Sequence, residues 1–194
     1  YNYYYKESEN LKSVIIKDKK LLEVTELENI IPDGKNVIIE VTKAGICGSD
    51  IHNWEAGEPK GLVMGHEYCG KVINPGSRSD LNIGDRVTSL PISPCKTGNP
   101  QYCAHTWENA LGLSLTNQGA YGEKIKVNPD LVLKASENMT DEEIAMVEPV
   151  AVGLHAVHLA NITVGQKVLV IGGGIIGLVS AMFANNEGAS LVAL

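Results

Sequence analysis

The sequence is short of aromatic residues and of cysteine. Its 194 residues include one phenylalanine, two tryptophans, seven tyrosines and four cysteines. The cysteines lie far apart, at positions 47, 69, 95 and 103, and no secretory signal precedes them. Disulfide frameworks belong mainly to exported proteins, so this usage favours reduced thiols and a cytoplasmic location.

Positive charge and long hydrophobic runs are also scarce. Sixteen basic residues face 23 acidic ones, which gives a net charge of −7. A surface of this sign does not neutralise a phosphate backbone, so no nucleic-acid partner is expected. The longest uncharged apolar run, at 168–176, contains three glycines and falls well short of the ~20 residues that cross a bilayer. No membrane partner is expected either.

The first two thirds of the chain have the pattern of an all-β unit. Tyrosines crowd the first five positions, ahead of any periodic pattern, so residues 1–11 are predicted to be an N-terminal arm. Short β-branched runs separated by turn residues follow. They predict strands at 13–16, 21–25, 37–42, 68–73, 86–90 and 121–127, with a turn at 82–85. Together these segments predict a partly open β-barrel.

The periodicity changes from strand-like to helical at Thr140. Thr140 and Glu143 form a capping box, and the apolar spacing that follows is helical. Glu148-Pro149 is predicted to interrupt this helix, and a second helix is predicted at 150–160. A strand at 167–171, a helix at 178–186 and a strand from 189 then predict a β-α-β unit. The predicted division is 12–160 for a catalytic domain with connecting helices and 161–194 for the start of a cofactor domain.

A glycine-rich turn joins the predicted strand and helix of that unit. Gly172, Gly174 and Gly177 occupy the first, third and sixth positions of Gly-Gly-Gly-Ile-Ile-Gly. This pattern is typical of dinucleotide-binding turns, where a pyrophosphate faces the amides at a helix N-terminus. Gly172, Gly174, Ile175, Ile176 and Gly177 are therefore predicted to bind NAD or NADP. A glycine-rich connection without a ligand is the alternative.

Three short segments carry residue types that hold zinc. They contain Cys47, then His66 with Glu67, and finally Glu148. Thiolate, imidazole and carboxylate are all zinc ligands, and three protein ligands leave a fourth position for water or substrate. Each residue alone is more simply a buried cysteine or histidine. Their order along the chain, followed by a dinucleotide turn, favours a catalytic zinc site.

From about Lys12 to Leu194 the sequence resembles the zinc-dependent medium-chain alcohol and polyol dehydrogenases, in particular the sorbitol dehydrogenase-like branch. The motifs that carry the resemblance are Cys47 to His52, Gly65-His66-Glu67 and the run from Glu148 to Ala156. The resemblance implies a GroES-like barrel, mixed β and α/β in class, followed by the start of a Rossmann domain. It implies oxidation of a secondary alcohol or polyol to a ketone with NAD(P), and a homo-oligomer at full length.

The resemblance also assigns roles to residues. Cys47 and His66 would bind zinc directly, and Glu67 or Glu148 would bind zinc or hold its water. Asp50 would accept a hydrogen bond from the far nitrogen of His66, with a turn-capping aspartate as the alternative. Ser49 and His52 would carry the proton of the alcohol to solvent.

One part of the family pattern is missing. Many members hold a second, structural zinc with four cysteines, whereas the corresponding stretch here has only Cys95 and Cys103. A four-cysteine site cannot be formed, so no structural zinc is expected, and His105 is expected to be an ordinary loop residue.

The sequence also contains too few elements of the cofactor domain to form a complete nucleotide-binding fold. One strand, one helix and the beginning of a second strand are a small part of a doubly wound fold. The 194 residues alone are therefore expected to be inactive and to expose apolar surface in the β-α-β unit. Two other functions stay open: a zinc-free quinone reductase-like member of the superfamily, and a non-catalytic metal-binding barrel.

Overall fold

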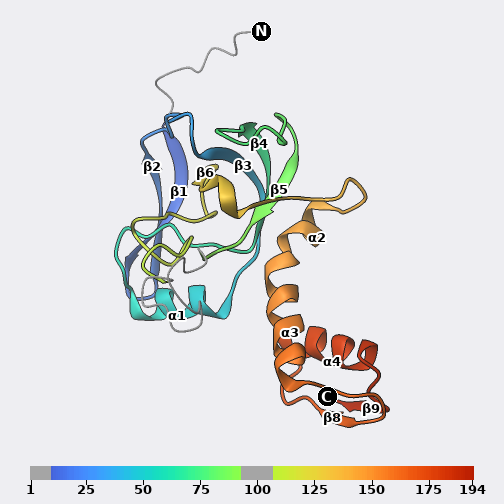
Figure 1. Cartoon of the computed structure of the whole chain (residues 1–194). Helices are drawn as coiled ribbons and strands as arrows, with labels where there is room; N and C mark the ends of the chain where they lie inside the picture. Colours follow the sequence, from blue (N-terminus) through green and yellow to red (C-terminus); the bar gives the residue numbers. More distant parts are fainter. Residues whose placement is uncertain (1–9, 93–106) are drawn as a thin grey trace. The chain divides into compact units, whose positions relative to one another are not determined.

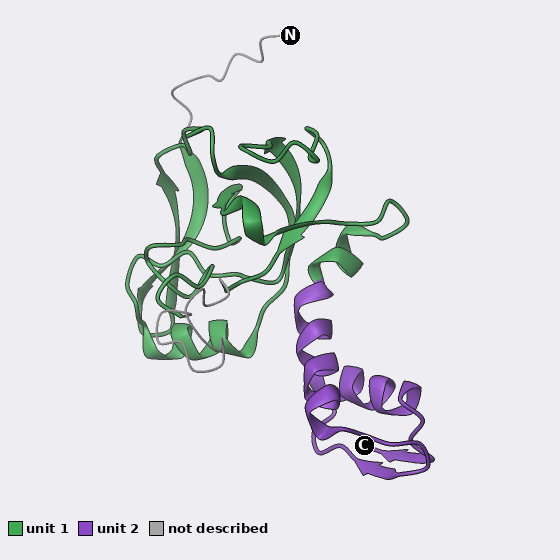
Figure 2. Cartoon of the chain, viewed as in Figure 1, with its two compact units in different colours: residues 1–145 green, residues 146–194 purple. Residues whose placement is uncertain are grey.

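The computed structural model describes residues 10–92 and 107–194. The chain divides into two compact units, residues 1–145 and 146–194 (Figure 2). The predicted domain boundary, after residue 160, lies within the second of these units. It concerns domains rather than compact units and stays a prediction.

The first unit is built from antiparallel strands (Figure 1). A hairpin pairs β1 with β2, as predicted, and a five-stranded sheet has the order β6-β3-β4-β5-β7. The 3-10 helix η3 leads directly into β7. The bounds of these elements are Leu11–Asp18 (β1), Leu21–Leu27 (β2), Val37–Ala44 (β3), Tyr68–Asn74 (β4), Arg86–Ser89 (β5), Lys124–Val127 (β6), Pro129–Leu131 (η3) and Val132–Lys134 (β7).

Strand β1 extends the sheet toward closure. The Val14 N–H donates to the carbonyl of Tyr121 (2.7 Å), just before β6 begins. Toward the other end of β1, the Ile16 N–H donates to the carbonyl of Leu62 (3.0 Å). The hairpin is thus bonded to segments on two sides, and the predicted partly open barrel is confirmed.

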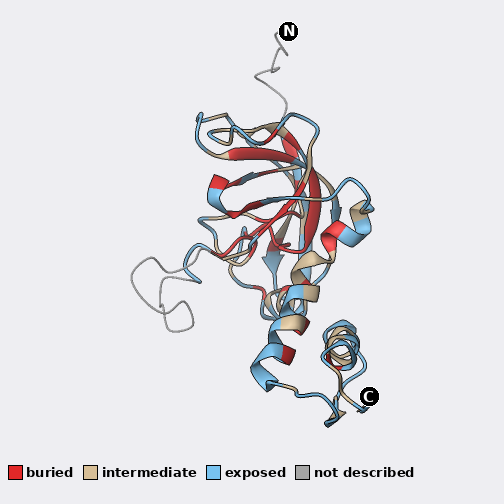
Figure 3. Cartoon of the chain, turned by 45° about the vertical axis from the view of Figure 1, so that its right-hand side comes forward, coloured by how far each residue is buried: buried red, intermediate tan, exposed pale blue. Residues whose placement is uncertain are grey.

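The core of the first unit lies inside this barrel (Figure 3). Strand β3 begins with three buried residues, as predicted for a strand covered on both faces, but its second half is more exposed. Residues from all five strands of the sheet meet there with residues of η3 and of neighbouring loops. The members are Val37, Ile39, Tyr68, Val72, Leu81, Val87, Leu111, Ala120, Ile125, Val127, Leu131 and Val132.

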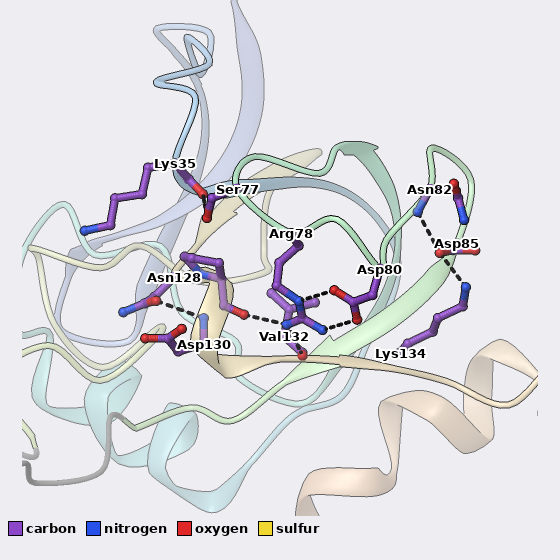
Figure 4. A network of polar contacts seen from close by, with 11 residues as sticks. Lys35, Ser77, Arg78, Asp80, Asn82, Asp85, Asn128, Asp130, Val132 and Lys134 are labelled. Carbon is purple, nitrogen blue, oxygen red and sulfur yellow. Dashed lines mark hydrogen bonds and ion pairs between the residues drawn. The ribbon is translucent and has the colours of Figure 1, made fainter.

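Polar contacts fasten the loop between β4 and β5 to the barrel (Figure 4). Arg78 makes a two-pronged ion pair with Asp80, at 2.7 and 2.8 Å. The same guanidinium donates to the carbonyls of Pro129 (2.6 Å), the first residue of η3, and Val132 (3.0 Å), the first residue of β7. One side chain therefore holds the β4–β5 loop against η3 and the start of β7, which are distant in sequence. Bidentate arginine contacts are geometrically specific.

Two helices belong to the first unit. Helix α1 (Gly48–Ala56) was not predicted and begins directly after Cys47. Helix α2 (Asp141–Ala145) begins with the predicted capping box. The Glu143 N–H donates to the Thr140 hydroxyl (3.2 Å), while the Glu143 carboxylate accepts from the Thr140 N–H (2.7 Å).

The second unit is the predicted β-α-β unit preceded by a helix. Its elements are α3 (Val147–Ala160), β8 (Lys167–Leu169), α4 (Ile175–Asn186) and β9 (Leu191–Ala193), and β8 pairs with β9 in parallel. The prediction that Glu148-Pro149 breaks the helix was wrong, because the break falls at Met146. Pro149 lies in the first turn of α3, where a missing N–H costs no helical hydrogen bond. Among the described residues, no helix has the length and apolar character needed to cross a membrane.

Candidate metal centre

Three of the predicted ligands lie together in the first unit. The ligand atoms of Cys47, His66 and Glu67 are all within 4.8 Å of one another. Cys47 immediately precedes α1, and His66 and Glu67 immediately precede β4. His66 and Glu67 are buried, whereas Cys47 is half-buried. One sulfur, one nitrogen and one oxygen donor therefore converge at the boundary between the barrel and α1.

The start of α1 places Cys47 in this cluster. Cys47 is the N-cap residue, and its N–H donates to the carboxylate of Asp50 (2.9 Å). A carboxylate in the first turn satisfies a backbone donor and interacts favourably with the helix dipole. The turn-capping role of Asp50 is therefore present.

Asp50 also lies beside His66. Its Oδ1 is 4.0 Å from His66 Nδ1, and Asp50 is only 2% exposed. That separation is too long for a hydrogen bond, and neither atom has a hydrogen-bond partner within the described part of the chain. The predicted Asp50–His66 hydrogen bond is thus absent, although the two groups face each other.

Glu67 is held in an enclosed position. The pKa of its carboxyl is raised, mainly by burial and also by the negative charge of Asp50. His66 and the Cys47 thiol act in the opposite direction and lower this pKa. A Cβ atom placed on Gly45 would lie 2.5 Å from Glu67 Oε2, so Gly45 leaves the room that this carboxylate fills. A buried carboxylate is costly unless it has a cationic partner. The mixed donor set and the unpartnered buried atoms beside it fit a zinc ion.

Tyr121 is a further member of the site, and sequence analysis missed it. Its hydroxyl lies 2.9 Å from Asp50 Oδ2 and 2.8 Å from the carbonyl of Gly45. Burial raises the pKa of Tyr121, and the charge of Asp50 raises it further, so the hydroxyl keeps its proton. Tyr121 and Asp50 are 71 residues apart, and no periodicity or motif links residues at such a distance.

The two predicted proton-relay residues both belong to α1. Ser49 lies in its first turn, and the Ser49 hydroxyl is buried without a hydrogen-bond partner among the described residues. His52 is exposed. Their roles stay predictions.

The remaining predicted zinc residues lie elsewhere. Glu148 is half-buried in the first turn of α3, in the second unit, and its part in metal binding stays a prediction. Cys95, Cys103 and His105, which bear on the structural zinc, lie outside the described residues.

The three glycines of the predicted dinucleotide-binding pattern differ in backbone conformation and in the space around them. Gly172 adopts φ +114°, which suits only glycine. A Cβ on Gly177 would lie 1.7 Å from the Gly172 carbonyl oxygen, so this glycine allows the helix and the turn to meet. Gly174 precedes α4 and has open space around it, and Ile175 and Ile176, the first helical residues, are exposed. The turn thus leaves the start of α4 open to a ligand.

Comparison with known families tests the resemblance. The family described as the alcohol dehydrogenase GroES-like domain matches residues 33–137, which is more than half of the chain. The chain belongs to this alcohol dehydrogenase family. The predicted resemblance to zinc-dependent medium-chain alcohol and polyol dehydrogenases is confirmed, and with it the fold class of a GroES-like barrel followed by the start of a Rossmann domain.

Individual dehydrogenases of this kind support the assignment. The chain is 36% identical to sorbitol dehydrogenase of Bos taurus, over 83% of this chain and 48% of the relative. It is 33% identical to L-galactonate-5-dehydrogenase of Escherichia coli (strain K12), over 84% and 49%. The crystal structure of 2R,3R-butanediol dehydrogenase from Bacillus subtilis superposes with a TM-score of 0.83 at 28% identity, over 94% of this chain and 56% of that one. The chain spans about half the length of the curated relatives it matches.

Proposed function

We propose that the protein to which this chain belongs is a zinc-dependent oxidoreductase. It oxidises a secondary alcohol or polyol to a ketone and transfers the hydride to NAD or NADP. The substrate classes are sugar alcohols, polyol phosphates and vicinal diols. The observation that carries the proposal is the convergence of Cys47, His66 and Glu67 within 4.8 Å, inside a domain of the alcohol dehydrogenase family.

The ligand roles follow from the chemistry of the side chains. Cys47 and His66 hold the zinc ion, and a carboxylate of Glu67 or Glu148 completes the protein ligands. Zinc makes a bound hydroxyl more acidic, as it lowers the pKa of bound water to about 7. A single catalytic ion is proposed, with no structural zinc.

Proton movement is assigned to α1. Ser49 accepts the proton of the substrate hydroxyl, and the proton passes toward His52 and solvent. The buried Ser49 hydroxyl has no hydrogen-bond partner within the described ranges, so it is available for this bond, and the exposed His52 meets water. The relay lets a proton leave while the substrate stays shielded.

The second unit supplies the start of the cofactor site. The backbone N–H groups at Gly174, Ile175 and Ile176 face the pyrophosphate at the positive end of α4. The open space around Gly174 supports this placement. A parallel β-α-β unit with this turn also disfavours a non-catalytic barrel.

Metal analysis tests the site on the chain itself. We expect about one zinc per chain after dialysis, and none in Cys47→Ala or His66→Ala, because each removes a ligand. Cys69→Ala is the matched control, since Cys69 is a buried thiol in a separate hydrophobic cluster with Ile144 and Ala145. Zinc that survives Cys47→Ala, or wild-type chain that takes up none, would contradict the metal centre and favour a zinc-free member of the superfamily.

Activity is tested on a full-length protein that contains this chain. We expect turnover of at least one sugar alcohol, polyol phosphate or diol with NAD or NADP, and its loss in Ser49→Ala with zinc retained. The 194-residue chain alone is expected to bind zinc but not to turn over, because it carries one β-α-β unit. A zinc-loaded full-length protein that is inactive with every substrate class would overturn the proposed reaction. We also propose a homo-oligomer for that protein, which light scattering can check.

A further inference from the structure

We propose that Tyr121 is a positioning residue for the metal centre: its hydroxyl holds the Asp50 carboxylate beside His66, where the carboxylate can accept the Nδ1–H of the metal-bound imidazole and orient it. The inference rests on the proposed function, because it assumes that Cys47, His66 and Glu67 hold zinc. It assigns a role to a residue that belongs to none of the zinc-binding motifs.

The Asp50 carboxylate is fixed by two donors on one oxygen. Asp50 Oδ2 accepts from the Cys47 N–H and from the Tyr121 hydroxyl, both at 2.9 Å. Two donors from different segments restrict rotation of a carboxylate more than one donor does. The other oxygen, Oδ1, is consequently directed to the side of His66, 4.0 Å from Nδ1.

Tyr121 is itself held in place at the backbone and at the ring. Its N–H donates to the Met64 carbonyl (2.9 Å), and its carbonyl accepts from the Val14 N–H (2.7 Å). The ring lies against Gly65, where an added Cβ would be 2.7 Å from the ring carbon Cδ1. Gly65 directly precedes His66, so Tyr121 is anchored to the segment that carries the imidazole.

The hydroxyl also reaches the segment that carries Cys47. Its oxygen lies 2.8 Å from the Gly45 carbonyl, and the Gly45 N–H donates to the Glu67 carbonyl (2.7 Å). A single hydroxyl proton serves two acceptors here, and the charged Asp50 carboxylate is the stronger one. Tyr121 therefore connects the chain around Cys47 with the chain around His66.

Among the described residues, loss of this hydroxyl would leave the Asp50 carboxylate with one donor, the Cys47 N–H. A buried carboxylate with fewer donors turns toward other partners, and the orientation of His66 then becomes less restricted. Partners that orient a metal-binding histidine typically change metal affinity by about 10- to 100-fold when they are removed.

The test compares Tyr121→Phe with Tyr68→Phe in the chain. Both variants lose one hydroxyl from a tyrosine of the first unit, but the Tyr68 ring lies in the barrel core. Zinc affinity is measured by competition with a chromophoric chelator. We expect Tyr121→Phe to bind zinc about 10-fold more weakly and Tyr68→Phe to bind within about 2-fold of wild type. The cobalt-substituted Tyr121→Phe chain should also show a shifted visible spectrum, which a purely structural loss would not produce.

The Asp50→Asn background keeps the proposal testable if Tyr121→Phe unfolds. Asp50→Asn alone should weaken zinc affinity at least as much as Tyr121→Phe does. The double variant should lose less than about a further 2-fold relative to Asp50→Asn, because Tyr121 acts through Asp50. Additive losses of binding free energy would instead indicate that the two residues act independently. Unchanged zinc affinity and cobalt spectrum in Tyr121→Phe, wild-type affinity in Asp50→Asn, or additive losses in the pair would each overturn the inference. Absence of zinc from the wild-type chain would instead overturn the proposed function, and the inference with it.

Discussion

The two units differ in how completely they bury their own apolar residues. In the barrel, the strand residues of the core are buried, and Ile39 is 0% exposed. In the second unit, Leu169 of β8 is 70% exposed and Ile171, just after β8, is 91% exposed. This agrees with the apolar exposure predicted for the β-α-β unit. A parallel sheet is ordinarily covered on both faces, and the sheet of the second unit is not. The barrel therefore buries its apolar core with its own residues, whereas the second unit does not.

The difference bears on the two candidate sites. The metal cluster forms from residues of the barrel unit alone, which is why side chains from two segments already converge there. The glycine turn belongs to a unit whose few strands leave apolar surface uncovered. We therefore expect substitutions in the barrel core to destabilise the first unit alone, and substitutions in the glycine turn to destabilise the second unit alone.

The largest effect is expected in the barrel core. Ile39→Ala should lower the free energy of unfolding of the first unit by about 2–5 kcal/mol, because it leaves a cavity among buried neighbours. Both tryptophans, Trp54 and Trp107, lie in this unit, so fluorescence during urea unfolding follows it. Ile83→Ala is the matched control, since Ile83 is 68% exposed, and should stay within about 0.5 kcal/mol. Equal losses of unfolding free energy in the two variants would show that the barrel does not depend on its buried core for stability.

The next effect is expected in the glycine turn. Gly177→Ala should destabilise the β8–α4 connection by about 1–3 kcal/mol, because its Cβ would meet a backbone carbonyl that cannot move aside easily. Hydrogen exchange of residues 167–186 should become faster, while the barrel amides stay protected. Gly174→Ala adds the same methyl group where nothing lies within 4 Å. If Gly174→Ala loosens the turn as much, close packing is not what Gly177 provides.

A smaller effect is expected at the metal cluster. Gly45→Ala should weaken zinc binding about 10-fold (roughly 1.4 kcal/mol), because the methyl group displaces the Glu67 carboxylate. Gly48→Ala, whose Cβ meets nothing within 4 Å, is the control. Zinc titration measures both. Unaltered affinity in Gly45→Ala would argue that Glu148, rather than Glu67, supplies the carboxylate.

The smallest effect is expected on the stability of the metal-free chain when Glu67 is replaced. Its pKa is raised in the folded chain, so the folded state binds the proton more tightly than the unfolded state, and ionisation of Glu67 costs stability at neutral pH. Glu67→Gln should therefore be slightly more stable than wild type at pH 7 in the presence of a chelator. The difference should shrink as the pH falls through the pKa of Glu67. Urea unfolding from pH 7 to pH 5 measures this, and a variant less stable at pH 7 would contradict it. With zinc present, wild type should regain the advantage.

Most of the strands and the β-α-β unit could be predicted because they depend on local patterns. The hairpin turn, the Thr140 capping box and the glycine turn are each encoded within a few residues. Helix α1 was missed, since nine residues with one buried side chain give no clear helical period. Strand β7 was missed because three residues are too short for an alternating pattern.

The site itself was only partly predictable. Residue type and motif order identified Cys47, His66 and Glu67, which the fold brings together. Tyr121 joins them through a contact over 71 residues, which depends on the register of the barrel and on no local signal. The separation of Asp50 and His66 likewise depends on side-chain placement, which spacing along the chain does not specify.

The position of Cys47 at the start of α1 makes its thiol a chemical probe of metal binding. Cys47 is half-buried, whereas Cys69 is completely enclosed, so an alkylating reagent meets the two thiols at very different rates. A ligated thiolate is also shielded from such reagents. Peptide-resolved labelling at position 47 can therefore record how much of a preparation carries metal, without any substrate or cofactor.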